Sequence, residues 1–198
     1  MRVRSLPNIV MVLLGLLVVA APASAQTGDP GGAAPPTAAS GGYQYGVTDP
    51  SLTPMVAGSV AKLQPDGLAA APADAPPEVQ SAIWAANTII GLPYVYGGGH
   101  NLRFKGRGYD CSGTVSFALH GANLLRAPLD SGSFMRWGLA GQGAWFTVYT
   151  NPGHAFAVIA GLRLDTSPAG DPSGLRGPRW RPVLRSTRGF KARHPLGF

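Results

Sequence analysis

Cysteine is almost absent from this sequence: Cys111 is the only one in 198 residues. A single cysteine cannot close an internal disulfide, which excludes the small secreted folds that depend on such bridges. Metal ligands are also sparse. The four histidines are dispersed, and none forms a pair at zinc-like spacing such as H-E-x-x-H. We therefore expect neither a metal ion nor another cofactor.

Long apolar runs are missing beyond the first 25 residues. There, Arg2 and Arg4 precede an apolar core at residues 9–20, and Ala23-Ser24-Ala25 has the small residues of a cleavage site. The alternative is an uncleaved anchor, but the run is shorter than the roughly 20 residues that a spanning helix needs. The pattern predicts a signal peptide at residues 1–25, a product that is secreted or held in the cell envelope (periplasm or cell wall), and no stable membrane span after cleavage.

Acidic residues are scarce in the second half of the chain. Residues 79–198 hold thirteen bases and four acids, whereas residues 26–78 hold one base and five acids. A basic surface attracts polyanions, but export and the lack of aromatic residues interleaved with the bases argue against nucleic acid. Two interpretations of the basic C-terminal extension stay open: a solvated surface, or a contact with an anionic wall polymer. Its bases are Arg176, Arg179, Arg181, Arg185, Arg188, Lys191 and Arg193.

The composition divides the exported chain into two parts. Residues 26–77 are rich in Gly, Pro and Ala and are predicted to form a flexible linker, in which residues 52–63 either form a weak helix or pack on the domain. Residues 78–198 are predicted to form the folded domain. Apolar spacing predicts helices at 77–90 and from Cys111 to about 125, then strands at 144–149, 154–160 and 162–166 and an edge strand near Trp180. This order indicates an α+β fold, with helices followed by an antiparallel sheet.

Cys111 lies where a helix is predicted to begin, after Tyr109-Asp110 and before Ser112-Gly113. Unpaired backbone N–H groups at a helix N-terminus favour a thiolate, and the same groups stabilise an oxyanion. A buried, inert thiol is the simpler alternative.

A thiolate nucleophile needs an imidazole beside it and a third polar group that orients the ring. His154 begins a strand with an apolar middle, and the reversal at Gly161 returns Asp165 to nearly the same level. Each has a simpler interpretation: His154 as a polar strand end, Asp165 as the start of a turn.

Three segments together resemble the NlpC/P60 cysteine peptidases. They are Gly91-Leu92-Pro93-Tyr94-Val95-Tyr96-Gly97-Gly98, Tyr109-Asp110-Cys111-Ser112-Gly113-Thr114-Val115 and Gly153-His154-Ala155-Phe156-Ala157-Val158-Ile159. Their order and spacing also match, and the resemblance spans about residues 79–168. It implies a papain-like fold, catalytic residues Cys111, His154 and Asp165, and substrate contacts from Tyr94, Asp110 and Ser112.

The resemblance also implies a reaction: hydrolysis of amide bonds in peptidoglycan stem peptides. Our hypothesis from the sequence is therefore a secreted cysteine hydrolase with a Cys-His-Asp triad. Two alternatives stay open. One is acyl transfer to an amine or another amidase reaction at the same site, and the other is a catalytically inactive wall-binding module.

Overall fold

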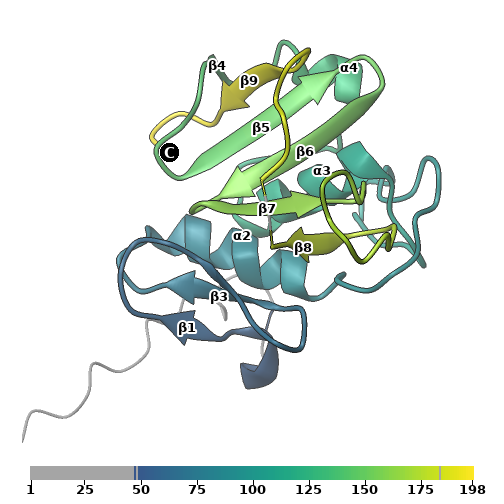
Figure 1. Ribbon diagram of the computed structural model, residues 1–198. Helices are drawn as coiled ribbons and strands as arrows, with labels where there is room; N and C mark the ends of the chain where they lie inside the picture. Colours follow the sequence, from purple (N-terminus) through teal and green to yellow (C-terminus); the bar gives the residue numbers. More distant parts are fainter. Residues whose placement is uncertain (1–46, 48, 183) are drawn as a thin grey trace, which may run out of the picture. The chain divides into compact units, whose positions relative to one another are not determined.

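The computed structural model describes residues 47, 49–182 and 184–198. The predicted signal peptide and the first part of the predicted linker, residues 26–46, lie outside the described residues. The described part is α+β, with an antiparallel six-stranded sheet (Figure 1). None of its helices is both long and apolar enough to cross a membrane.

The six-stranded sheet has the strand order β4-β9-β5-β6-β7-β8. Its strands are β4 (Leu139–Ala140), β5 (Phe146–Asn151), β6 (His154–Ile159), β7 (Leu162–Asp165), β8 (Arg179–Arg181) and β9 (Lys191–His194). In the β6–β7 hairpin, Ala157 pairs with Leu164 and Val158 with Arg163. Because side chains alternate between faces, His154, Phe156, Arg163 and Asp165 share one face, opposite the apolar face that contributes to the core. The hairpin thus brings the predicted base and its predicted partner to one place.

Helices α2 (Pro77–Asn87) and α3 (Cys111–Gly121) begin where the sequence predicted, and each ends a few residues early. Proline and Glu78 suit the first turn of α2, since proline has no N–H to leave unpaired. Gly121 lies against Ala85, where a Cβ atom would collide, so the glycine permits the two helices to pack closely. Val115, Leu119 and the inner residues of β5–β7 form one core with them.

The prediction of a flexible linker up to residue 77 is wrong for residues 49–77. A 3-10 turn, η1 (Pro50–Leu52), is followed by a small sheet of β1 (Met55–Val56), β2 (Lys62–Leu63) and β3 (Ala69–Pro72) in the order β1-β3-β2. β3 is buried, and the Asn87 side chain from α2 binds both the N–H and the C=O of Ala69, each at 3.0 Å. Of the two alternatives for residues 52–63, packing on the domain is the correct one, because Leu52 and Leu63 are partly buried against the core.

The composition of residues 49–77 was misleading because an alanine side chain buries little apolar surface by itself. Here the small side chains of β3 let its backbone approach α2, and the backbone groups find partners on Asn87 and on Gln80, whose amide donates to the Pro72 and Ala75 carbonyls. These hydrogen bonds replace the ones that the backbone of β3 would make with water, so the segment is ordered although it has few large apolar residues. The folded unit therefore begins before residue 78.

Candidate active site

Cys111 is the first residue of α3, and its side chain is buried, with the residue 8% exposed. Asp110 caps the helix: its Oδ1 accepts from the Gly113 N–H at 2.7 Å. The cap fixes where the helix begins and so places the thiol over the first turn, whose N–H groups favour negative charge. The predicted location of Cys111 at a helix N-terminus is confirmed.

His154 and Asp165 form a hydrogen-bonded pair, with His154 Nε2 2.9 Å from Asp165 Oδ1. Asn151 fixes the backbone at this strand start by accepting from the His154 N–H at 2.9 Å. With Nε2 on Asp165, the other ring nitrogen, Nδ1, is the one left for the thiol. The Cys111 thiol and the His154 ring each shift the pKa of the other, so the three predicted triad residues are brought together.

The two pKa values of the thiol–imidazole pair shift toward the ionised state. Burial would lower the pKa of His154, but hydrogen bonds to Asp165 and Cys111 and their charges outweigh it and raise this pKa to about 9. Burial would raise the pKa of Cys111, but the hydrogen bonds from His154 and from the Ala155 backbone lower it below its ordinary value. Both shifts favour the ionised form of the pair, a thiolate beside an imidazolium.

Asp165 is held from several sides in an environment without solvent. Its side chain is fully buried, and its Oδ1 also accepts from the Ser167 N–H at 2.8 Å. On the other oxygen, Oδ2, Arg185 Nη1 lies at 3.2 Å and Arg163 Nε at 3.6 Å. A buried carboxylate held in this way can orient an imidazole and stabilise its imidazolium form.

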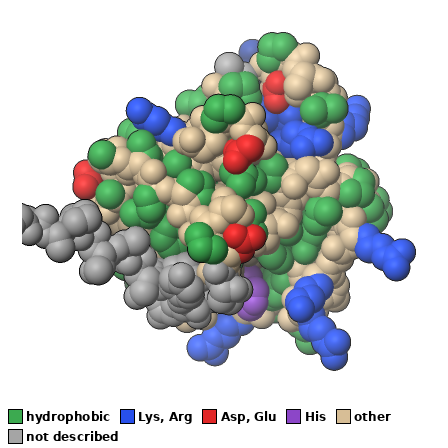
Figure 2. Space-filling view, turned by 90° about the horizontal axis from the view of Figure 1, so that it is seen from below, with side chains coloured by type: hydrophobic (Ala, Val, Ile, Leu, Met, Phe, Trp, Pro, Cys, Tyr) green, Lys and Arg blue, Asp and Glu red, His purple; other side chains and the backbone are tan. Residues whose placement is uncertain are grey.

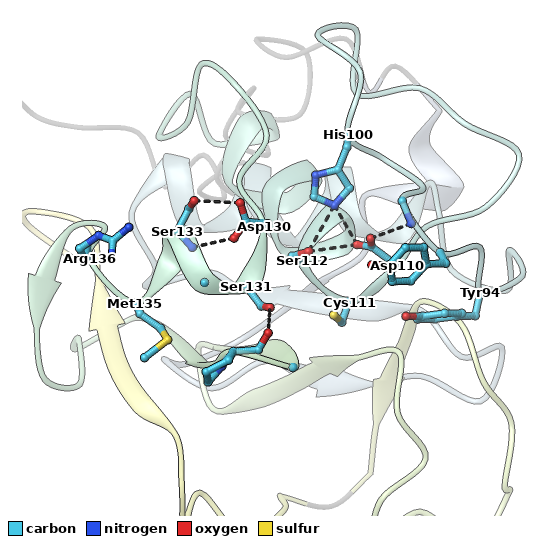
Figure 3. A pocket seen from close by; sticks show the side chains of 15 residues that line it. Tyr94, His100, Asp110, Cys111, Ser112, Asp130, Ser131, Ser133, Met135 and Arg136 are labelled. Atoms are coloured by element: carbon cyan, nitrogen blue, oxygen red, sulfur yellow. Dashed lines mark hydrogen bonds and ion pairs between the residues drawn. The ribbon is translucent and has the colours of Figure 1, made fainter.

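A second imidazole–carboxylate pair lies beside Cys111. His100 Nε2 is 3.0 Å from Asp110 Oδ1, and the Ser112 hydroxyl lies 3.1 Å from the same oxygen and 3.2 Å from Nε2 (Figure 3). The other oxygen, Oδ2, accepts from the Gly97 N–H at 3.0 Å. Asp110 therefore ties the glycine-rich loop to the start of α3, and most of its acceptor capacity is used within the protein.

A cavity of about 790 Å³ opens over Cys111. Figure 3 shows Tyr94 on one side of the sulfur with its hydroxyl pointing toward Cys111, and Asp130, Ser133 and Arg136 on the other side. Burial and the nearby Cys111 and Asp110 raise the pKa of Tyr94, so its hydroxyl is a neutral donor at neutral pH. The lining residues are Tyr94, Tyr96, Gly97, His100, Asp110, Cys111, Ser112, Asp130, Ser131, Gly132, Ser133, Met135, Arg136, Pro152 and Gly153.

The three residues predicted to contact substrate, Tyr94, Asp110 and Ser112, all line this cavity. The far wall of the cavity is formed by α4 (Ser131–Phe134). Its Asp130 cap is a signal that the sequence carries, since Asp followed by small polar residues is typical of a helix start.

His100 and Arg185 are parts of the site that the sequence analysis missed. His100 follows the triple glycine, and nothing in the sequence tells that this loop folds back onto Asp110. Arg185 lies 20 residues after Asp165 along the chain, in a segment without regular structure.

The basic C-terminal extension is not simply a solvated surface, so that interpretation is wrong for part of it. Arg181 is fully buried and binds the Asp171 carboxylate at 2.7 Å, and Arg193 donates to the Trp137 and Gly138 carbonyls. Arg176, Arg188 and Lys191 are exposed. On the face in Figure 2, Lys and Arg side chains stand in several separate places.

No family model matches the chain, and no curated protein matches it either. Within the described ranges, no three His, Cys, Asp or Glu side chains gather as a metal-ligand set.

Proposed function

We propose that this protein is a secreted cysteine hydrolase with a papain-like fold that cleaves amide bonds in peptidoglycan stem peptides. The observation that carries the proposal is the chain of contacts from the Cys111 thiol through the His154 ring to the buried Asp165 carboxylate. Neither a structural thiol nor a polar strand end would require an imidazole with its pKa raised to about 9 beside a thiol with a lowered pKa.

In the proposed reaction, the Cys111 thiolate attacks the amide carbonyl carbon and forms a C–S bond. Backbone N–H groups in the first turn of α3 stabilise the oxyanion. The His154 imidazolium gives its proton to the leaving nitrogen as the C–N bond breaks, which leaves a thioester on Cys111. His154 then takes a proton from a water molecule that attacks the thioester, and the acid product leaves as the C–S bond breaks.

The charges in the cavity support a substrate that carries carboxylates, as stem peptides do. The carboxylates of Asp110 and Asp130 are occupied by neighbouring N–H and hydroxyl groups, Asp130 by the Ser133 N–H at 2.8 Å and its hydroxyl at 2.9 Å. Arg136, by contrast, is exposed, and its side chain has no hydrogen-bond or ion-pair partner within the described residues. The cavity therefore offers a ligand a free cation on the α4 side and little free negative charge.

The proposal is tested by incubating the mature protein with purified peptidoglycan and identifying new termini by mass spectrometry. We expect amide cleavage by the wild type and none by Cys111→Ala, with the circular dichroism of the two proteins unchanged. Cleavage that persists in Cys111→Ala would contradict the assignment of the nucleophile. Adding an amine acceptor shows in the same products whether the acyl group passes to water or to an amine.

A further inference from the structure

The two oxygens of Asp165 have different partners. Oδ1 faces the reaction, because it accepts from His154 and from the Ser167 N–H. Oδ2 faces away from it, toward two guanidinium groups, those of Arg185 and Arg163. The orientation of the imidazole therefore depends on what holds Oδ2.

Arg185 is itself held in a defined position. Its guanidinium lies over the Phe156 ring at 5.2 Å and over the Phe190 ring at 5.3 Å, and the side chain is only 19% exposed. The two rings contact each other edge to face, with centroids 5.2 Å apart. Cation–π contacts with two adjacent rings help to hold the guanidinium where its Nη1 meets Oδ2.

Arg163 is a poorer partner for Asp165. Its side chain is fully buried, its Nε lies 3.6 Å from Oδ2, and none of its guanidinium nitrogens makes a hydrogen bond within the described structure. A buried cation without hydrogen bonds attracts any carboxylate near it. Without Arg185, Oδ2 would be left with Arg163 as its only cationic partner within the described residues, at a distance longer than a hydrogen bond.

We propose that Arg185 is a positioning residue for the triad, which fastens Oδ2 of Asp165 so that Oδ1 stays on His154. The inference rests on the proposed function, since the triad is the part it positions. Arg185 does not line the cavity that contains Cys111. Its loss should therefore lower kcat and leave KM nearly unchanged.

The structure offers a way to restore the missing group. A smaller cavity of about 250 Å³ lies beside Arg185, between the 184–187 segment and side chains of β5 and β6 such as Tyr149, Phe156 and Val158. In Arg185→Ala this space is enlarged by the lost side chain. A methylguanidinium ion that enters it would lie against the same two aromatic rings and meet Oδ2.

The kinetic test compares Arg185→Ala, Arg185→Lys and the control Arg188→Ala on a soluble stem peptide. A small displacement of a catalytic group costs about 10²-fold in rate, so we expect kcat of Arg185→Ala to fall by about 10- to 100-fold. Lysine keeps the charge but not the planar fork, so Arg185→Lys should lose less. Added methylguanidine should raise kcat of Arg185→Ala alone. Arg188 is exposed, and its side chain has no partner within the described residues, so Arg188→Ala should match the wild type.

The decisive readout is the NMR titration of the His154 imidazole, which requires no substrate. The charged groups that face the imidazole are the Cys111 thiol and the Asp165 carboxylate. The cations that face this carboxylate are Arg185 and Arg163. Arg181 donates to the Asp165 backbone carbonyl and pairs with the Asp171 carboxylate. If Arg185 positions Asp165, its removal lets the carboxylate leave the ring, and the pKa of His154 falls from about 9 toward its ordinary value. If Arg185 acted only as a charge, removing a cation would raise this pKa instead.

A pKa that rises or stays unchanged in folded Arg185→Ala would overturn the proposal, as would an unchanged kcat. Should Arg185→Ala fail to fold, Arg185→Lys carries the same titration, with a smaller fall expected. Failure of the proposed function looks different: wild-type protein would cleave no stem peptide, while the His154 titration would still report on Arg185.

Discussion

Two imidazole–carboxylate pairs flank one thiol in this protein, and they differ in what surrounds the carboxylate. Both pairs join Nε2 to an Oδ1 at about the same distance, 2.9 Å for His154–Asp165 and 3.0 Å for His100–Asp110. Asp165 is fully buried, and its other oxygen meets guanidinium groups. Asp110 caps a helix and receives two backbone N–H groups and a hydroxyl.

The comparison teaches that a histidine–aspartate distance does not by itself mark a catalytic pair. His154 also interacts with Cys111, and its pKa is raised to about 9. His100 contacts Asp110 and Ser112, which position the glycine-rich loop against α3. In the proposed reaction the first pair carries the chemistry, and the second shapes the cavity wall.

Replacing each histidine in turn should give the largest difference in activity between the two pairs. We expect His154→Gln to lower kcat/KM by at least about 10³-fold, because the leaving nitrogen loses its proton donor. His100→Gln should cost less than about tenfold, since glutamine can still donate to Asp110 and the thiol keeps its partner. The measurement is steady-state hydrolysis of a stem peptide. Equal losses in the two variants would remove the distinction between the pairs.

Replacing the two aspartates should give the next largest difference in activity. Asp165→Asn keeps the shape but presents an amide to the ring, and we expect a fall of about 10² to 10⁴-fold in kcat from the wrong tautomer and a less stable imidazolium. Asparagine caps helices as well as aspartate does, so Asp110→Asn should keep α3 in place and lose less than about tenfold. A loss in Asp110→Asn as large as that in Asp165→Asn would show that Asp110 takes part in the chemistry.

The alkaline limit of the reaction gives a smaller but more specific comparison. In the proposed reaction the imidazolium protonates the leaving nitrogen, and the pKa of His154 is raised to about 9. Activity should therefore fall as the pH rises through about 9. In Asp165→Asn this limit should move to lower pH, because the hydrogen bond and charge that raise the pKa are lost. In Asp110→Asn it should stay in place, and rate profiles of the three proteins check this.

The sequence indicated the first pair far better than the second, for a physical reason. His154 and Asp165 belong to one hairpin, whose reversal at Gly161 fixes which residues meet, and Cys111 follows a cap that local spacing predicts. Such short-range geometry can be read from a pattern. The contact of His100 with Asp110 depends on how an irregular loop closes, for which the sequence offers no periodic pattern.

The other differences from the sequence-based predictions lie in segments whose contacts are far away along the chain. Residues 49–77 looked like a linker because they hold few large apolar residues, but β3 is buried against α2 through the Asn87 side chain. The C-terminal extension looked like a basic surface, but Arg181 and Arg185 are partners of Asp171 and Asp165. Composition describes what a segment can bury alone, whereas these residues are ordered by groups that lie far away in the sequence.

The most direct test of the central claim is the rate at which iodoacetamide modifies Cys111 at pH 6.5, compared with free cysteine. A thiolate held by the His154 imidazolium should react faster than free cysteine at this pH, because free cysteine is mostly protonated, and the excess should disappear in His154→Gln. Denatured protein gives the rate of the same thiol without its surroundings. A folded Cys111 that reacts no faster than free cysteine, with no change in His154→Gln, would contradict the account.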